Sequence, residues 1–304
     1  MAVDYGKTPS AYTPDTILYT GMLGKIAKQV VEGEGVKSLF DVFQKEDIEY
    51  GKDLEVVLYE AATGEAYDRK ALLTARANDP QKHVLIFKEL TERTYGVTVD
   101  ENQIRQSANN ASVAERNAEV IIDTLYQGAN LEKNAYVMDI FTGLTAGVPL
   151  AENVNIVDGG SLAEISDEAT ARAFVLAVRQ AAKKIRKGSA SVNAFNIKKE
   201  AKRVILVTPS DNVDKVDVLL RMNVYNDEYS RFAVDDVVEY DASEYPEANG
   251  ATWVVDERFV QLRKQREYYG EQPIARSANV DAYLNTAYMY AACPLFSGVK
   301  ISET

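Results

Sequence analysis

The sequence predicts a protein of the mixed α+β class. Apolar residues recur at helical spacing over residues 110–147, which predicts one unusually long amphipathic helix. Two strand-like runs occupy residues 54–59 and 84–91, and residues 154–264 alternate short apolar strands with helices. A chain of 304 residues is long enough for two packed units.

The N-terminal 40 residues predict an extended arm followed by a helix. Residues 1–14 contain Pro9 and Pro14 and show little periodicity. From Asp15 onward, apolar residues recur at helical spacing until Gly33.

The runs 54–59 and 84–91, the second continuing toward Tyr95, predict the two strands of a long hairpin with the polar stretch 61–82 at its tip. A two-stranded hairpin is marginally stable alone. We therefore expect it to lie on a partner surface, either on another chain or on its own domain.

The long helix is expected to be a spine across which other elements lie. Ser112 followed by Glu115 matches a capping box at its start, and Gly147 with Pro149 predicts its end. About 35 residues at 1.5 Å each span on the order of 50 Å. A short helix is also expected just before it, at residues 100–108.

Residues 154–264 are expected to form a compact α/β unit. Three helices are predicted in this unit. The first begins at Ser166 and ends at Gly188, the second follows Pro209, and the third begins at Asp256. The predicted strands are 154–157, 204–207, 232–234, 237–240 and 252–255. The tyrosine-rich stretch 266–301 is strand-prone and is expected to return to the long helix.

Composition limits the function classes. The net charge of −12 argues against nucleic-acid binding by bulk electrostatics. The single cysteine, Cys293, points to a reducing compartment, and the single histidine, His83, lowers the expectation of a metal site or a catalytic triad. We expect no signal peptide and no transmembrane span. The 18 tyrosines fit either protein interfaces or half-buried sheet positions.

Two segments are strongly biased in charge. Residues 179–203 carry nine Lys or Arg against one acid, and residues 235–247 carry six acids and no base. The basic segment could contact phosphate or an acidic neighbouring surface, or it could be a helix end followed by a solvated loop. The acidic segment is expected to be a solvated surface, since it lacks a calcium-loop pattern. Neither G-x-S-x-G nor G-x-G-x-x-G is present, so we expect no catalytic, cofactor-binding or metal-binding residues.

A family resemblance emerges in residues 252–301. The stretch Val254-Val255-Asp256-Glu257-Arg258 is followed by the tyrosine-rich run 279–292 and by the ending Pro294-Leu295-Phe296-Ser297-Gly298-Val299. This resembles the C-terminal part of major capsid proteins of tailed bacteriophages with the HK97-type fold. The predicted order of elements is similar to that family along most of the chain.

The resemblance implies an arm and helix at 1–40, an extended hairpin (the E-loop) at 41–97, a peripheral (P) domain with the spine helix at 98–153 and 265–304, and an inserted axial (A) domain at 154–264. It implies a structural protein, not an enzyme, that self-assembles as hexamers and pentamers into an icosahedral head enclosing double-stranded DNA. The hairpin is expected to reach the next subunit.

The implied partners are further copies of the chain, a separate scaffolding protein, a portal, and packaged DNA bound on the inner face without sequence specificity. Neither a membrane nor a cofactor is expected. The implied location is the virion, after assembly in the host cytoplasm. Two alternatives stay open: a tail-tube or connector protein of the virion, and an α/β hydrolase-like enzyme built on residues 154–264.

Overall fold

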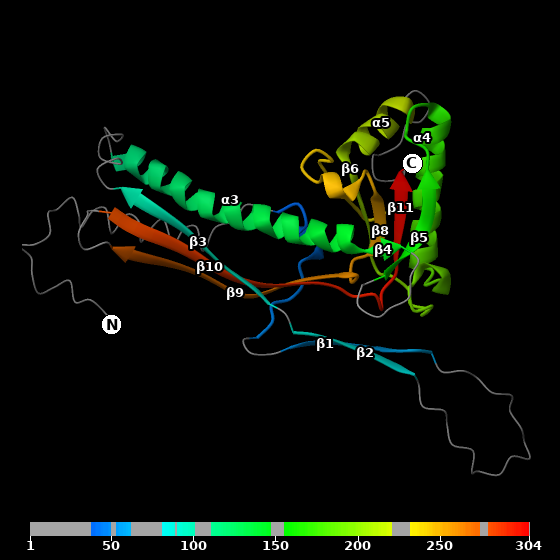
Figure 1. The fold of residues 1–304 in the computed structure, drawn as a ribbon, viewed down its shortest axis with the longest axis horizontal. Coiled ribbons are helices and arrows are strands. Elements are labelled where there is room, and N and C mark those ends of the chain that lie inside the picture. The colour runs from blue at the N-terminus through cyan, green and yellow to red at the C-terminus, as the bar shows by residue number, and fades with distance from the viewer. Residues whose placement is uncertain are drawn as a thin grey trace, which may run out of the picture. The chain divides into compact units, whose positions relative to one another are not determined.

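The computed structural model describes residues 38–49, 53–61, 81–88, 90–100, 111–146, 155–220, 232–273 and 279–303 (Figure 1). Two compact units divide the chain between them. Unit 1 includes residues 92–133 and 266–287, and unit 2 comprises residues 39–91, 134–265 and 288–304. The predicted arm, the helix from Asp15 and the helix at 100–108 lie outside the described residues.

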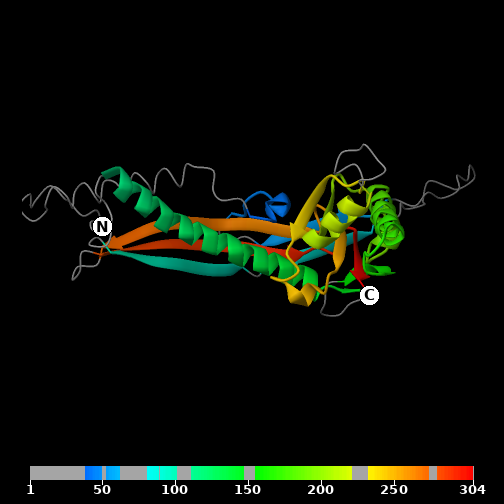
Figure 2. The same ribbon diagram turned by 90° about the horizontal axis from the view of Figure 1, so that it is seen from above.

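Unit 1 contains most of a long helix and of a three-stranded sheet. The strand order is β3 (Thr91–Asp100), β10 (Asn279–Ala292) and β9 (Val260–Pro273), and the helix is α3 (Ala111–Gly143). Residues 134–143 of α3, 260–265 of β9 and 288–292 of β10 belong to unit 2. Figure 2 shows α3 running along these strands. Leu125 of α3 is buried against Ala282 and Leu284 of β10, with Tyr95 packed beside them. The predicted spine therefore packs on a sheet.

Polar contacts join α3 to β3 within unit 1. Glu132 of α3 accepts hydrogen bonds from Arg93 Nε at 2.6 Å and from the Tyr95 hydroxyl at 2.5 Å. Burial, and then the Glu132 carboxylate, raise the pKa of Tyr95 well above its ordinary value. The phenol therefore remains a hydrogen-bond donor to Glu132.

Unit 2 is organised around a six-stranded mixed sheet. Its order is β4 (Thr145–Ala146), β5 (Asn155–Leu162), β11 (Gly298–Glu303), β8 (Thr252–Asp256), β6 (Val204–Pro209) and β7 (Asp236–Tyr240). β11–β8 and β8–β6 are antiparallel, and the other neighbours are parallel.

Alternate residues of β6 are buried in two different hydrophobic cores of unit 2. Val204 and Leu206 face α4 (Glu168–Arg186) and α5 (Ser210–Leu220), whereas Ile205 and Val207 belong to the other core. That second core contains Trp253, the last turns of α3, and the short 3-10 helix η1 (Asp41–Phe43). Two more 3-10 helices, η2 (Ala190–Val192) and η4 (Pro246–Ala248), lie in loops. Strands β6 and β8 are buried on both faces, as their uninterrupted apolar runs predict.

The structure confirms several predicted elements within a residue or two. These are β1 (Leu54–Tyr59), β6, α5, β7 and β8. The helix expected from Ser166 is α4, whose N-cap is Asp167: its side chain accepts from Thr170 N while the Thr170 side chain accepts from Asp167 N. Gly188 follows the helix at φ +61°.

Two details predicted for the spine helix were wrong. The described part of α3 begins at Ala111, so Ser112 lies inside the helix and is not its cap. The helix ends at Gly143, four residues before Gly147, because Thr145 and Ala146 pair with Asn155 and Ile156 as β4.

The strand predicted at 84–91 and continuing toward Tyr95 is in fact two strands. β2 (Lys82–Phe87) pairs with β1, whereas β3 lies beside β10. The chain leaves one sheet and enters another between Phe87 and Thr91. Strand-forming residues continue through this point, so local pattern does not reveal the change of partner.

The helix predicted from Asp256 does not form. Phe259 N donates to Asp256 O at 2.8 Å, which closes a tight turn, and β9 starts at Val260. The strand predicted at 232–234 is also absent, because Ala233 has a positive φ of 56° that no strand accommodates.

The C-terminus was also misplaced. Residues 298–303 were expected to return to the long helix, but they form β11 between β5 and β8. Within the described part of the chain, no helix is long and apolar enough to cross a membrane.

Candidate interaction surfaces

The β1–β2 hairpin has two apolar faces. In the antiparallel register Val56 lies opposite Leu85, and Leu58 lies opposite His83. Leu58 is buried in the second core of unit 2, and Val56, Leu85 and Phe87 pack against that core. The inner face of the hairpin thus lies on its own unit, one of the two outcomes that the sequence left open.

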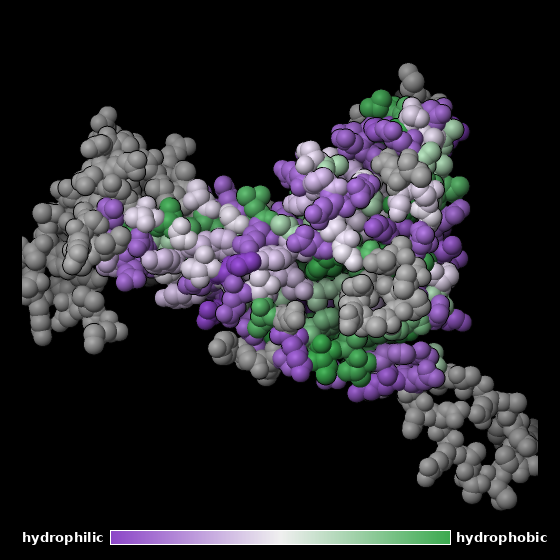
Figure 3. Space-filling view, viewed as in Figure 1, coloured by the Kyte–Doolittle hydropathy of each residue, from purple (hydrophilic) through white to green (hydrophobic). Residues whose placement is uncertain are grey.

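The outer face of the hairpin is exposed, and it is apolar apart from Glu55 and Lys82 at its two ends. Val57 lies opposite Val84, and both are 38% exposed, while Tyr59 is 59% and Ile86 55% exposed. Hydrophobic side chains gather over β1 and β2 in Figure 3. An antiparallel pair with one face on a core usually turns a polar face to water. This outer face is therefore a candidate contact surface for another protein.

The single histidine lies at the end of the same hairpin. His83 Nε2 is 2.8 Å from Glu60 Oε1, and its ring lies 6.5 Å from the ring of Phe195. His83 thus links the end of β1 to the start of β2. Among the described residues, no group of three or more His, Cys, Asp and Glu side chains is placed to hold a metal.

The single cysteine is a core residue. Cys293 is fully buried, and burial raises the pKa of its thiol to about 12. A thiol in that environment stays protonated at neutral pH, so Cys293 lacks the thiolate that nucleophilic chemistry requires.

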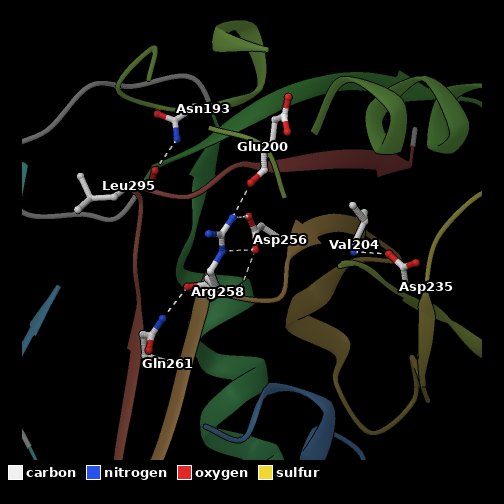
Figure 4. A network of polar contacts seen from close by, with 8 residues as sticks. All are labelled: Asn193, Glu200, Val204, Asp235, Asp256, Arg258, Gln261 and Leu295. Atoms are coloured by element: carbon white, nitrogen blue, oxygen red, sulfur yellow. Dashed lines mark hydrogen bonds and ion pairs between the residues drawn. The ribbon is translucent and has the colours of Figure 1, made fainter. Parts of the chain in front are cut away.

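A buried ion pair fixes the turn between β8 and β9 (Figure 4). Asp256 is 1% exposed and accepts from Arg258 N at 2.9 Å, Nε at 3.0 Å and Nη2 at 2.7 Å. Arg258 Nη2 also donates to Glu200 O at 2.8 Å, and the guanidinium lies 4.6 Å from the centre of the Phe296 ring. A buried carboxylate with this many donors is well satisfied. The pair holds the loop at Glu200 against the β8–β9 turn.

The basic and acidic segments that stand out in the sequence meet in unit 2. Arg186 pairs with Asp235 at 2.9 Å, and Arg203 pairs with Asp236 and, at 3.7 Å, with Glu257. The sequence alone did not reveal this pairing, because residues 204–234 separate the two segments. Part of each charged segment is therefore neutralised within the chain.

Comparison with known proteins identifies the family. The model of the Phi29-like phage major capsid proteins matches residues 18–302. The chain belongs to this family. No protein with a curated description matches the sequence of this capsid protein significantly.

Solved structures show the same fold at low sequence identity. The capsid structure of Staphylococcus phage Andhra has a TM-score of 0.65 at 12% identity, covering 90% of this chain and 86% of that one. The mature capsid of bacteriophage PhiM1 gives 0.59 at 14% identity, with 90% and 89% covered. The capsid of cyanophage P-SCSP1u gives 0.56 at 11% identity, with 90% of each chain covered.

The capsid protein therefore has the α+β, HK97-type fold that the sequence resemblance predicted. It is a structural protein of the virion and forms the shell of a tailed-phage head. The family match does not favour the tail-tube, connector and hydrolase alternatives.

Proposed function

We propose that the capsid protein assembles as hexamers and pentamers into an icosahedral head around double-stranded DNA, and that the β1–β2 hairpin binds a neighbouring subunit. The exposed apolar outer face of the hairpin carries this proposal. The inner face is already used within the subunit, so the outer face is free to contact a second copy.

The energetics favour a repeated contact. Burying the half-exposed Val57, Tyr59, Val84 and Ile86 would be worth roughly 1 kcal/mol each. One such contact is modest, but every subunit of a closed shell repeats it. A hairpin that reaches its neighbour therefore adds stability that a single pair of subunits does not show.

The same proposal assigns the regions of the chain: 1–40 to the arm and first helix, 41–90 to the E-loop, 91–153 and 265–297 to the P-domain, and 154–264 with 298–304 to the A-domain. Two bounds differ from those predicted from the sequence, because β3 lies beside β10 and β11 pairs with β5 and β8. Assembly would take place in the host cytoplasm, with a scaffolding protein and a portal as partners. The packaged DNA would meet only the inner face, without sequence specificity, in keeping with the net charge of −12.

The double variant V84T/I86T tests the hairpin contact. Thr keeps strand propensity and nearly the shape of Val, but it removes apolar surface from the outer face. We expect thermal unfolding of the isolated subunit to stay within about 2 °C of wild type, because both positions are exposed. Electron microscopy and light scattering should show few or no shells at concentrations where the wild type assembles.

The matched control is Val218→Thr on α5. Val218 is 72% exposed, so this variant makes the same chemical change far from the hairpin. It should assemble as the wild type does. Normal shells from V84T/I86T would refute the hairpin contact.

A further inference from the structure

Six lysines form a basic edge on unit 2. They lie at the C-terminal end of α4 and in the loop before β6, and they are Lys183, Lys184, Lys187, Lys198, Lys199 and Lys202. All six are exposed, and none has an ion-pair partner among the described residues. Asp235 and Asp236 are already paired with Arg186 and Arg203, and Asp158 lines a cavity together with Lys184. Glu200 is the only acid within this basic segment, so the edge keeps a clear positive excess.

The fold holds the two groups of lysines together. Ala201 N donates to Ile185 O at 3.4 Å, and a Cβ at Gly188 would lie 2.6 Å from the carbonyl carbon of Lys199. Arg258 secures the same loop through Glu200 O. Loop and helix end are thus in direct backbone contact. A cluster that is held in place in this way loses less entropy on binding than flexible lysines would.

An acidic edge lies at the opposite end of the same strands. β6 and β7 run parallel, with Ile205 opposite Asp236 and Pro209 opposite Tyr240. The basic loop leads into the start of β6, whereas Asp241, Glu244 and Glu247 follow the end of β7. These three acids are exposed, and Asp211 at the start of α5 is exposed at the same end. Six residues of β6 at about 3.3 Å each separate the two edges by roughly 17–20 Å.

The acidic edge is charged and ordered at neutral pH. The Asp241 carboxylate accepts from Ser243 N at 2.8 Å and from Ser243 Oγ at 2.7 Å, and these bonds lower its pKa. Segment 235–247 contains no base. One subunit therefore presents opposite charges at the two ends of one rigid sheet.

We propose that the basic edge of one copy binds the acidic edge of the next copy around a capsomer ring. This inference rests on the proposed assembly into hexamers and pentamers. A ring joins subunits head to tail, so two different surfaces of each copy must be complementary. Opposite charges at opposite ends of unit 2 meet that requirement and set the direction of the ring. Nucleic acid is the less favoured partner, because the net charge of −12 repels phosphate at long range.

A charge swap tests the proposal. The variants are K199E/K202E on the basic edge, E244K/E247K on the acidic edge, and the combination of all four changes. All four positions are exposed, and none of them forms an ion pair with another described residue of the subunit. The combined variant keeps the wild-type net charge of −12, because the two pairs of changes cancel. Thermal unfolding of each subunit controls for folding.

The readout is the protein concentration at which nuclease-treated protein begins to assemble, measured by light scattering and checked by electron microscopy. Each one-sided variant places like charges against each other, so we expect this concentration to rise about tenfold or more. The combined variant should begin to assemble at a protein concentration within about threefold of that of the wild type. Restoration by two changes on different edges requires that the edges meet.

Three results would overturn the proposal. If K199E/K202E stays defective in the combined variant while E244K/E247K assembles normally, the lysines bind another partner, such as nucleic acid. If all variants assemble as wild type does, neither edge is an interface. If the wild type itself forms no rings or shells, the proposed function fails first and this inference fails with it.

Discussion

At Gly188 the backbone and its neighbour leave no room for a side chain. The residue has φ +61°, in the left-handed region that glycine favours, and the loop at Lys199 lies against its Cα. Cys293 shows a second residue-level effect, since its burial decides the state of its thiol. The surrounding residues thus decide which residue type fits at position 188 and which protonation state Cys293 adopts.

We expect Gly188→Ala to destabilise the subunit by about 2 kcal/mol or more. The left-handed backbone alone costs an alanine about 1–2 kcal/mol, and the contact with Lys199 adds to it. Chemical denaturation of the isolated subunit measures the change. The control is Gly143→Ala at the end of α3, where a Cβ meets nothing within 4 Å and φ is not positive. It should be neutral or stabilising by up to about 1 kcal/mol. Equal effects of the two substitutions would contradict this account.

Cys293 should make stability fall at high pH. Its thiol pKa rises from 9.0 to about 12 on folding, so above pH 9 the unfolded chain releases a proton that the folded chain keeps. The free energy of unfolding should therefore fall between about pH 9 and 12, by at most about 1.4 kcal/mol per pH unit from this group. Cys293→Ala removes this dependence and leaves that of the tyrosines. Parallel pH profiles for wild type and variant would show that the thiol does not contribute.

At the scale of elements, α3 has two ends with different roles. Near its C-terminal end, the Phe141 ring lies 5.3 Å from that of Trp253, 5.9 Å from Phe43 and 6.3 Å from Phe40. These rings join the helix to the sheet of unit 2. Leu131, further toward the N-terminus, is 66% exposed. The apolar periodicity of the helix therefore does not by itself say how tightly each position is packed.

Phe141→Ala should destabilise the subunit by about 3–5 kcal/mol, because it leaves a cavity among large rings. Leu131→Ala on the same helix should change the free energy of unfolding by no more than about 0.5 kcal/mol. Thermal or chemical unfolding measures both. A similar loss at both positions would mean that the aromatic cluster is not the main anchor of α3.

At the scale of the whole molecule, one subunit carries two kinds of surface. The hairpin offers an exposed apolar face, and unit 2 offers opposite charges at opposite ends of β6 and β7. Apolar contacts persist at high salt, whereas exposed ion pairs are screened within about 8 Å at physiological ionic strength. Raising the salt concentration should therefore weaken contacts between the charged edges more than contacts made by the hairpin.

The purified chain at high concentration, with and without crowding salt, should form closed shells or free rings of six and five copies in the electron microscope. Light scattering follows the same process in solution. Open tubes, or rings of one other symmetry, would contradict assembly into hexamers and pentamers. This measurement tests the stoichiometry directly, whereas the variants above test individual contacts.

The amino-acid pattern was sufficient where a short apolar run is buried on both faces, because β6 and β8 lie where the sequence predicted them. β1, which keeps one face exposed, was also placed correctly, and α4 and α5 follow their polar caps and apolar spacing. The same local rules misread Asp256, since an acid before an apolar run fits both a helix start and a strand turn. The buried pair with Arg258 decides for the turn.

The sequence alone determined the positions of β1, β6, β7 and β8, the length of the spine to within a few residues, and the family. Only the tertiary structure decided which strands pair, that β11 enters the sheet of unit 2, and that Arg186 and Arg203 neutralise Asp235 and Asp236. The physical reason is the separation along the chain over which each kind of interaction acts. Periodicity and capping act over a few residues of the chain, whereas strand partners and ion pairs join residues that are brought together only by folding.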